Sequence, residues 1–321
     1  MSQSLMDSIV LAAPRSNQQG HLFNLCVQAV SAAWKDPLND PDNSPDATTR
    51  ALWLAAAGRH CSFQQAMLEA LPELSPAEIE RLKALVDSFV KGERLAFLTG
   101  RWRFMGLDFL TGPQALIPRK ETELLCSKAT ALLHSLVEER GNAIVVEPCT
   151  GSGNLAVTLA RAEPDCFIWA MDLSDEALEL ARQNAIHFAV DQKIRFRPGD
   201  LFRPLEQAQP ALRADLIVCN PPYISSGKLD LPDSEVLKYG PRMAFDGGPF
   251  GLSIVSRLIH ESAQFLKPGS YLCFEAGAGQ GPLLAKLIGK LPQFASVQLD
   301  TEPRTGTPVL TARTSSPEPA F

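Results

Sequence analysis

The chain has 321 residues, of which 45% are hydrophobic and 21% are charged, and its formal net charge is -6. These proportions are ordinary for a folded globular protein, and the length fits one large domain or two modest ones. The acidic balance argues against tight, non-specific binding of duplex DNA, which depends on Lys and Arg.

The spacing of the cysteines and the length of the apolar runs indicate the cellular compartment of the protein. The seven cysteines occur singly, without a C-x-x-C pair, and Cys126, Cys219 and Cys273 stand in apolar surroundings. This usage predicts buried, reduced thiols, with no disulfide and no metal site. No run reaches the length of a transmembrane helix, and the N-terminus lacks the basic and apolar regions of a signal peptide. We therefore expect a cytoplasmic protein that does not bind a membrane.

The first part of the chain predicts a small helical domain. Residues 1–20 are polar and weakly patterned, so we expect them to be partly frayed. Apolar spacing predicts helices over 21–34, 48–58, 62–71 and 75–90, with a Pro- and Asp-rich loop over 36–46. Ser62 is an expected N-cap, and Ser75 to Glu78 have the residue types of a helix start. Either this domain is a lid that stabilises the sheet, or it grips a protein substrate.

The rest of the chain predicts an α/β domain. Residues 94–117 alternate in polarity around Gly106 and predict a β-hairpin that joins the two domains. A helix is expected over 121–137. Strands at 143–149, 167–173, 194–199, 214–220 and 270–276 then alternate with helices at 154–162, 175–189, 251–266 and 280–290. Such alternation indicates a mostly parallel sheet with helices on both faces. Final strands at 294–301 and 308–313 predict a C-terminal hairpin, and the Ser/Pro-rich tail is expected to be disordered.

A glycine-containing turn follows the first strand of this sheet. The β-branched run Val145-Val146 leads into Thr150-Gly151-Ser152-Gly153 and then into helix-forming residues. Gly151 and Gly153 can adopt positive φ and let a ligand approach the backbone, and the next helix would aim its positive end at that ligand. About 20 residues on, Asp172 ends a second apolar run, where a carboxylate can hold ribose hydroxyls. The pattern indicates a nucleotide-like cofactor.

A second turn, Asn220-Pro221-Pro222-Tyr223, follows the strand at 214–220 and is expected at the same edge of the sheet. Further segments stand in a characteristic order from about residue 90 to about residue 313: Gly92 to Gly100, Leu116 to Glu123, Asp246-Gly247-Gly248 with Gly251-Leu252, and Gly277 with Gln280-Gly281. With these segments the chain resembles the HemK/PrmC-type release-factor glutamine N5-methyltransferases, a family of class I S-adenosylmethionine (SAM)-dependent methyltransferases.

The resemblance implies a class I methyltransferase fold. This is a Rossmann-like α/β domain whose mostly parallel seven-stranded sheet ends in a C-terminal antiparallel hairpin, preceded by a small all-α domain and a β-hairpin linker. In this chain the expected parts are a helical substrate-recognition or lid domain over 1–92, the linker over 93–117, the SAM-dependent methyltransferase domain over 118–313 and a disordered tail over 314–321.

The resemblance also implies SAM as the cofactor. The loop would bind it with backbone amides, Asp172 would accept from the ribose hydroxyls, and Asp200 with Leu201 would hold the adenine. Glu147 would lie near the methionine amino group. The expected cofactor contacts are Glu147, Thr150, Gly151, Ser152, Gly153, Asp172, Leu173, Asp200, Leu201 and Asn220.

The acceptor would be a planar NH2 group, whose lone pair is delocalised and therefore a poor nucleophile. Hydrogen bonds to the Asn220 side-chain oxygen and the Pro221 carbonyl would fix this nitrogen, while Tyr223 offers a π face. The expected catalytic residues are Asn220, Pro221, Pro222 and Tyr223. Substrate contacts are expected from Asn220, Pro221 and Tyr223, and from Arg119 and Glu123 unless these two form only a helix-start ion pair.

Three positions depart from the family pattern. Cys149 stands where the family usually has Gly, with Pro148 before it, and SAM binding should survive if the backbone there is ordinary β or PPII. Lys120 stands where the family usually has Pro, and Gly240 replaces the Glu of a Tyr/Phe-Glu-Pro pattern. The last two alter the charge where the substrate is expected to bind.

The resulting hypothesis is methylation of the N5 atom of a glutamine, in the Gly-Gly-Gln loop of a peptide-chain release factor as protein substrate. The three departures keep open a small-molecule or amino-acid-like acceptor in specialised metabolism. Adenine N6 methylation of nucleic acid is a further alternative, against which the acidic balance weighs. A SAM-binding protein without catalysis is disfavoured by the presence of Asn220 and Tyr223.

Overall fold

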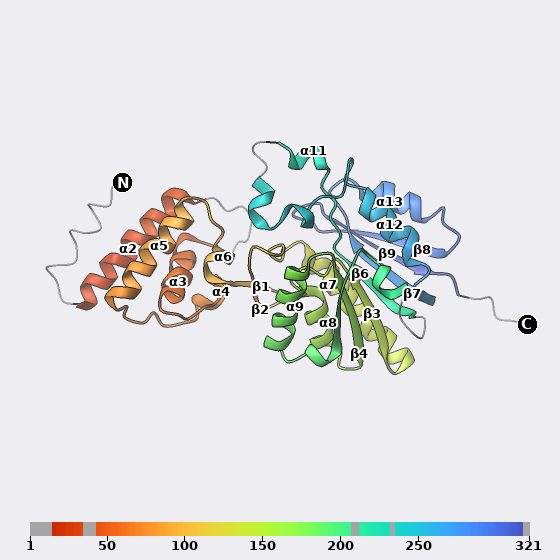
Figure 1. The fold of residues 1–321 in the computed structure, drawn as a ribbon, viewed down its shortest axis with the longest axis horizontal. Helices are drawn as coiled ribbons and strands as arrows, with labels where there is room; N and C mark the ends of the chain where they lie inside the picture. The colour runs from red at the N-terminus through yellow and green to blue at the C-terminus, as the bar shows by residue number, and fades with distance from the viewer. Residues whose placement is uncertain (1–14, 35–42, 207–211, 232–234, 317–321) are drawn as a thin grey trace, which may run out of the picture. The chain divides into compact units, whose positions relative to one another are not determined.

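The computed structural model describes residues 15–34, 43–206, 212–231 and 235–316, and the chain forms two compact units, Met1–Thr111 and Gly112–Phe321 (Figure 1). The expected frayed start up to residue 14, most of the expected loop over 36–46 and the end of the expected tail lie outside the described residues. Among the described residues, no helix combines the length and apolar character needed to cross a bilayer.

The first unit is built from α2 (Arg15–Ala33), α3 (Pro45–Ala56), α4 (Phe63–Ala66), α5 (Pro76–Val90) and α6 (Leu95–Thr99). The expected caps are confirmed, since the Ser62 hydroxyl accepts from the Gln65 amide and Ser75 forms a full capping box with Glu78. Helix α4 ends five residues earlier than predicted. Beyond it, side chains of α3 hydrogen-bond carbonyls of residues 66–72: Arg50 donates to Ala66 and Glu69, and the Trp53 indole to Pro72.

A hairpin completes this unit. Strand β1 (Arg101–Phe104) pairs antiparallel with β2 (Leu107–Leu110), and Met105 and Gly106 between them both have positive φ, as a two-residue hairpin turn requires. The hairpin is therefore confirmed, but residues 95–99, predicted to be extended, form helix α6, which ends at left-handed Gly100. The Asp108 carboxylate accepts from the Ser62 amide at 2.8 Å, so the hairpin is tied to the start of α4.

The second unit holds a seven-stranded sheet in the order β5-β4-β3-β6-β7-β9-β8. Its strands are β3 (Ala143–Pro148), β4 (Cys166–Asp172), β5 (Ile194–Pro198), β6 (Ala214–Cys219), β7 (Leu266–Glu275), β8 (Phe294–Thr301) and β9 (Pro308–Thr314). Strands β3 to β7 are parallel, and β9 pairs antiparallel with both β7 and β8. The expected mostly parallel sheet with a C-terminal antiparallel hairpin is confirmed.

Helices cover both faces of this sheet. They are α7 (Thr122–Arg140), α8 (Asn154–Ala162), α9 (Asp175–His187), α12 (Ser253–Ser262) and α13 (Gly281–Ile288), with short α10 (Arg203–Glu206) and α11 (Ser226–Leu229) in the connections. Val146, Ile217 and Leu272 share one core cluster with residues of α12 and α13. Side chains alternate along a strand, so Val145 and Leu216, also fully buried, face the layer that contains α7.

Most predicted boundaries lie within a few residues of the observed ones. The largest difference in this unit is at the helix predicted over 251–266, which spans only Ser253–Ser262. Strand β7 begins at Leu266, four residues earlier than predicted, because Leu266 pairs with Ala214 and the Ala214 amide donates to the Phe265 carbonyl. The pairing of Leu266 with β6 thus ends the helix earlier than its own apolar pattern predicts.

Candidate active site

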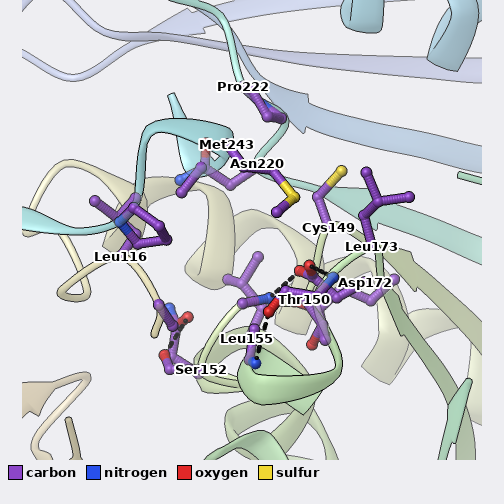
Figure 2. Close-up of a pocket in the computed structure, with 18 of the residues that line it drawn as sticks. Leu116, Cys149, Thr150, Ser152, Leu155, Asp172, Leu173, Asn220, Pro222 and Met243 are labelled. Atoms are coloured by element: carbon purple, nitrogen blue, oxygen red, sulfur yellow. Dashed lines mark hydrogen bonds between the residues drawn. The ribbon is translucent and has the colours of Figure 1, made fainter. Parts of the chain in front are cut away.

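The carboxyl ends of β3, β4, β5 and β6 meet at one edge of the sheet, as parallel neighbours must. A cavity of about 260 Å³ opens there, and Figure 2 shows Asn220 and Met243 on one side of it and Thr150, Leu155 and Asp172 on the other. The glycine turn and the Asn220 turn therefore face one shared space. Of the expected site residues, those that line it are Arg119, Glu147, Thr150, Gly151, Ser152, Asp172, Leu173, Asp200, Leu201, Asn220 and Pro222.

Four expected site residues do not line the cavity: Gly153, Pro221, Tyr223 and Glu123. Gly153 is the left-handed residue that starts α8, and a Cβ on it would lie 3.0 Å from the Ala181 side chain. Its requirement for glycine thus comes from backbone conformation and from the packing of α8 on α9. Gly151, also left-handed, would meet nothing with a Cβ and needs glycine only for its backbone.

Cys149 adopts a left-handed backbone conformation, with φ of 59°. It is neither β nor PPII, so the condition we attached to this residue is not met. A residue with a Cβ is strained in this conformation by about 1 kcal/mol. The Cys149 side chain lines the cavity (Figure 2) and also packs against the core cluster of α12 and α13. The chain thus carries a thiol at a position whose backbone favours glycine.

Two carboxyl groups stand beside the glycine turn. The Asp172 carboxylate accepts from the Gly151 amide at 2.9 Å and from the Ser174 amide at 3.0 Å, which fixes the turn against β4. Burial raises the pKa of Asp172, although these amides oppose the shift. Burial likewise raises the pKa of Glu147 to about 8, against hydrogen bonds from the Thr150 hydroxyl and the Ala156 amide. A cationic group in this cavity would favour the ionised form of both acids.

Asp200 and Leu201 line the cavity and also make contacts that serve the fold. Both Asp200 carboxylate oxygens lie 3.0 Å from one guanidinium nitrogen of Arg257, so this acid already has a partner on α12. Leu201 has a left-handed backbone, is 4% exposed and belongs to the core cluster. The two residues line the cavity, but Leu201 is mainly part of the packed interior.

The Asn220 turn is held by buried polar groups. The Asn220 amide nitrogen donates to the Thr122 hydroxyl at 3.1 Å, and the Tyr223 hydroxyl donates to Glu275 at 2.9 Å. The side-chain nitrogen of Gln280 donates to the Tyr223 carbonyl and to the Gly251 carbonyl, each at 3.3 Å. A Cβ on Gly251 would lie 2.2 Å from the Tyr223 carbonyl oxygen, so the loop beside the turn must be glycine there.

Comparisons with known proteins agree with this geometry. A family model described as "Methyltransferase small domain" matches residues 125–237. A release factor glutamine methyltransferase of Moorella thermoacetica is 35% identical over 245 residues, which cover 75% of this chain and 83% of that protein. The chain belongs to the release factor glutamine methyltransferase family. A family member from Geobacter sulfurreducens is 34% identical over 75% of this chain and 78% of its own length.

Among solved structures, a methyltransferase from Pyrococcus furiosus aligns with a TM-score of 0.47 and 19% identity, over 66% of this chain and 91% of that one. The expected family is thus confirmed by the curated relatives, and with it the expectation that the chain is a methyltransferase.

The structure accounts for two departures from the family pattern. Lys120 forms an ion pair with Glu123 at 2.9 Å, and Arg119 pairs with Glu121 at 3.0 Å. Both residues of the alternative Arg119–Glu123 ion pair therefore have another ion-pair partner near the start of α7. Arg119 also lies over the Tyr239 ring, 5.0 Å from its centroid. At Gly240, a Cβ would lie 2.9 Å from the Leu116 Cα, so the chain here leaves no room for a side chain.

Several residues at the site were not among those expected. Leu116, Pro118, Thr122, Met243 and Ala244 line the cavity. Glu275, at the end of β7, is fully buried and contacts both Tyr223 and Thr122. The signal for Thr122 and Gln280 was present, since both stand in segments that carry the family resemblance. Glu275 ends an apolar run, as Asp172 does, so a signal for it was also present. Met243 carries no local signal that separates it from a core residue.

Proposed function

We propose that this protein transfers a methyl group to the N5 atom of a glutamine side chain, in the Gly-Gly-Gln loop of a peptide-chain release factor. The observation that supports it most is the shared cavity, which the glycine turn and Asn220 line from opposite sides (Figure 2). The related release factor glutamine methyltransferases suggest the substrate class.

We further propose that SAM is the cofactor, and the residues of the cavity fit it. SAM supplies a methyl group on a positively charged sulfur. Glu147 and Asp172 put two carboxyl groups beside the turn, which suits a ligand with an ammonium group and a ribose. Gly151 leaves its backbone open to close approach, and Leu173, Leu201 and Ile254 offer apolar surface for a ring.

Asn220 would orient the acceptor. Its amide nitrogen is engaged by Thr122, and no donor among the described residues contacts its side-chain oxygen, so Oδ1 remains able to accept. The Asn220 oxygen would accept one N–H of the substrate amide. Although Pro221 does not line the cavity, its carbonyl at the neighbouring position of the turn stays the proposed acceptor of the other. These bonds restrict the nitrogen to one orientation and stabilise the positive charge that grows on it. The surplus proton leaves to water after transfer, so no residue is assigned as a base.

Pro222 and Tyr223 would support this arrangement from the same turn. Pro222 lines the cavity beside Asn220. The Tyr223 ring does not line it, and its hydroxyl is bound to Glu275. We therefore propose that Tyr223 acts mainly by holding the turn. Arg119 lines the cavity next to Tyr239 and is the proposed substrate contact of its segment, whereas Glu123 serves the ion pair with Lys120.

Labelled SAM, given to the full-length enzyme with an intact release factor, a Gly-Gly-Gln peptide, DNA or a metabolite extract, tests this proposal. We expect label in the release factor, lost when the glutamine of that motif is replaced by Ala. Label only in the metabolite fraction would support the small-molecule alternative, and label in DNA the adenine alternative. Label in none of the four would overturn the assignment of a methyltransferase active on these acceptors.

A further inference from the structure

A chain of buried hydrogen bonds runs behind Asn220. The Asn220 amide nitrogen donates to the Thr122 hydroxyl at 3.1 Å, and that hydroxyl donates to one oxygen of Glu275 at 2.8 Å. The other oxygen of Glu275 accepts from the Tyr223 hydroxyl at 2.9 Å. Thr122 is 1% exposed and Glu275 is 0% exposed. One buried acid thereby connects both ends of the Asn220–Tyr223 turn.

The direction of these bonds follows from the chemistry of the groups. An ionised carboxylate only accepts hydrogen bonds, and a threonine hydroxyl has a single proton. When that proton is given to Glu275, Thr122 can only accept from Asn220. The NH2 group of the amide must then face Thr122, because the flipped amide would bring its oxygen against the hydroxyl lone pairs. The oxygen of Asn220 is left on the opposite side of the amide.

We propose that Thr122 and Glu275 are positioning residues that select the amide orientation of Asn220 and so present its oxygen to the substrate nitrogen. This inference rests on the proposed function, since it gives Asn220 the task of accepting from the substrate. Neither residue is assigned contact with the substrate. Thr122 stands at the start of α7 and Glu275 at the end of β7, so two elements remote in sequence determine one amide.

The orientation of the Asn220 amide should depend on whether Glu275 is ionised. Burial raises the pKa of Glu275 to about 7, and the nearby Glu121 carboxyl also raises it. The hydrogen bonds from Thr122 and Tyr223 and the charge of Arg119 lower this pKa. Once protonated, Glu275 becomes able to donate, and Thr122 is free to donate to the Asn220 oxygen instead. The orientation is therefore enforced above the pKa of Glu275 and released below it.

Three variants test this with an intact release factor and saturating SAM: Thr122→Val, Thr122→Ser and Glu275→Gln. We expect kcat to fall roughly tenfold to hundredfold in Thr122→Val, by analogy with the loss seen for residues that orient a metal ligand, and to recover in Thr122→Ser. The Kd for SAM should stay within about threefold, since Thr122 and Glu275 act on the acceptor side. Thr130→Val is the matched control, because Thr130 also lies on α7 but its hydroxyl bonds to Cys126, one turn back on the same helix.

The pH profile separates positioning from a merely structural role. In the wild type, kcat at saturating SAM should fall as pH drops through about 7. This acid limb should vanish in Glu275→Gln, which should be slow at every pH. Thr122→Val with wild-type kcat, or an acid limb retained in Glu275→Gln, would overturn the inference. A wild-type enzyme that leaves the release factor unmodified would overturn the proposed function instead.

Discussion

At the scale of single residues, the site contains groups that lower the stability of the folded state. Cys149 holds a left-handed backbone that favours glycine, and Glu147 and Glu275 are carboxyl groups buried to 1% and 0% exposure. Each is at the carboxyl end of a strand. Strain and buried charge at such positions are typical of ligand-binding sites, which agrees with the roles proposed for this edge of the sheet.

Replacing Cys149 with Gly should stabilise the unliganded protein by about 1 kcal/mol, because glycine relieves the left-handed strain. Chemical unfolding would measure the change. Ala170→Gly is the control, since Ala170 is a buried residue inside β4 and should lose about 1 kcal/mol on the same change. Destabilisation of Cys149→Gly would mean that the packing of the thiol outweighs the strain.

At the scale of elements, the close contacts of the loop 246–252 position the Asn220 turn. Gly251 has φ of 71°, and a Cβ there would lie 2.2 Å from the Tyr223 carbonyl oxygen. The Gly247 amide donates to the Ile224 carbonyl at 2.8 Å, and the Ser226 amide to the Gly248 carbonyl at 3.0 Å. This explains why these glycines belong to the family pattern although they do not line the cavity.

Gly251→Ala should therefore lower kcat by tenfold or more, since the added methyl must displace the turn that carries Asn220. Gly141→Ala is the matched control, because Gly141 has φ of 81° but nothing within 4 Å of its Cβ position. Both variants carry backbone strain, so both should lose stability in thermal unfolding. Only Gly251→Ala should lose activity, and equal activities would show that the turn does not depend on this contact.

Local elements could be predicted from the sequence, whereas contacts between distant elements could not. The Ser75 capping box, the strand alternation and the turn after β3 are local patterns, and each was found where it was expected. The bonds from Thr122 to Glu275 and from Asn220 to Thr122 join residues 153 and 98 positions apart. Pairing of this kind depends on which strands become neighbours, and no local spacing contains it. The left-handed backbone of Cys149 was missed because cysteine rarely adopts it, although the glycine that the family usually has there was a signal for it.

At the scale of the whole molecule, the buried acids should make stability depend on pH. The pKa of Glu147 is raised from 4.5 to about 8 and that of Glu275 from 4.5 to about 7, mainly by burial. Between pH 4.5 and the raised pKa of each acid, the folded state binds more protons than the unfolded state. The free energy of unfolding therefore falls as pH rises through this range. We expect a loss of about 6 kcal/mol between pH 5 and 8. The double variant Glu147→Gln, Glu275→Gln should flatten this slope in unfolding curves, and an unchanged slope would show that other groups cause it.

The N-terminal unit is proposed to contribute to recognition of the protein substrate. Met67 and Leu68, just after α4, are 48% and 77% exposed, and exposed apolar side chains of this size are candidates for a protein contact. Leu68→Ser should lower kcat/KM several-fold for an intact release factor and leave a short Gly-Gly-Gln peptide unaffected. Leu283→Ser, 57% exposed on α13, should change neither value. Equal losses with factor and peptide would favour a stabilising role for this unit.

The most direct test of the proposed chemistry is mass spectrometry of the release-factor peptide that contains Gly-Gly-Gln, after incubation with SAM and either wild-type enzyme or Asn220→Ala. We predict one methyl group on the glutamine side chain with the wild type. Asn220→Ala should bind SAM within about threefold of the wild-type Kd and methylate at least ~100-fold more slowly, because the acceptor loses its orienting oxygen. An unmodified glutamine with the wild type, or an undiminished rate in Asn220→Ala, would contradict the role given to this cavity.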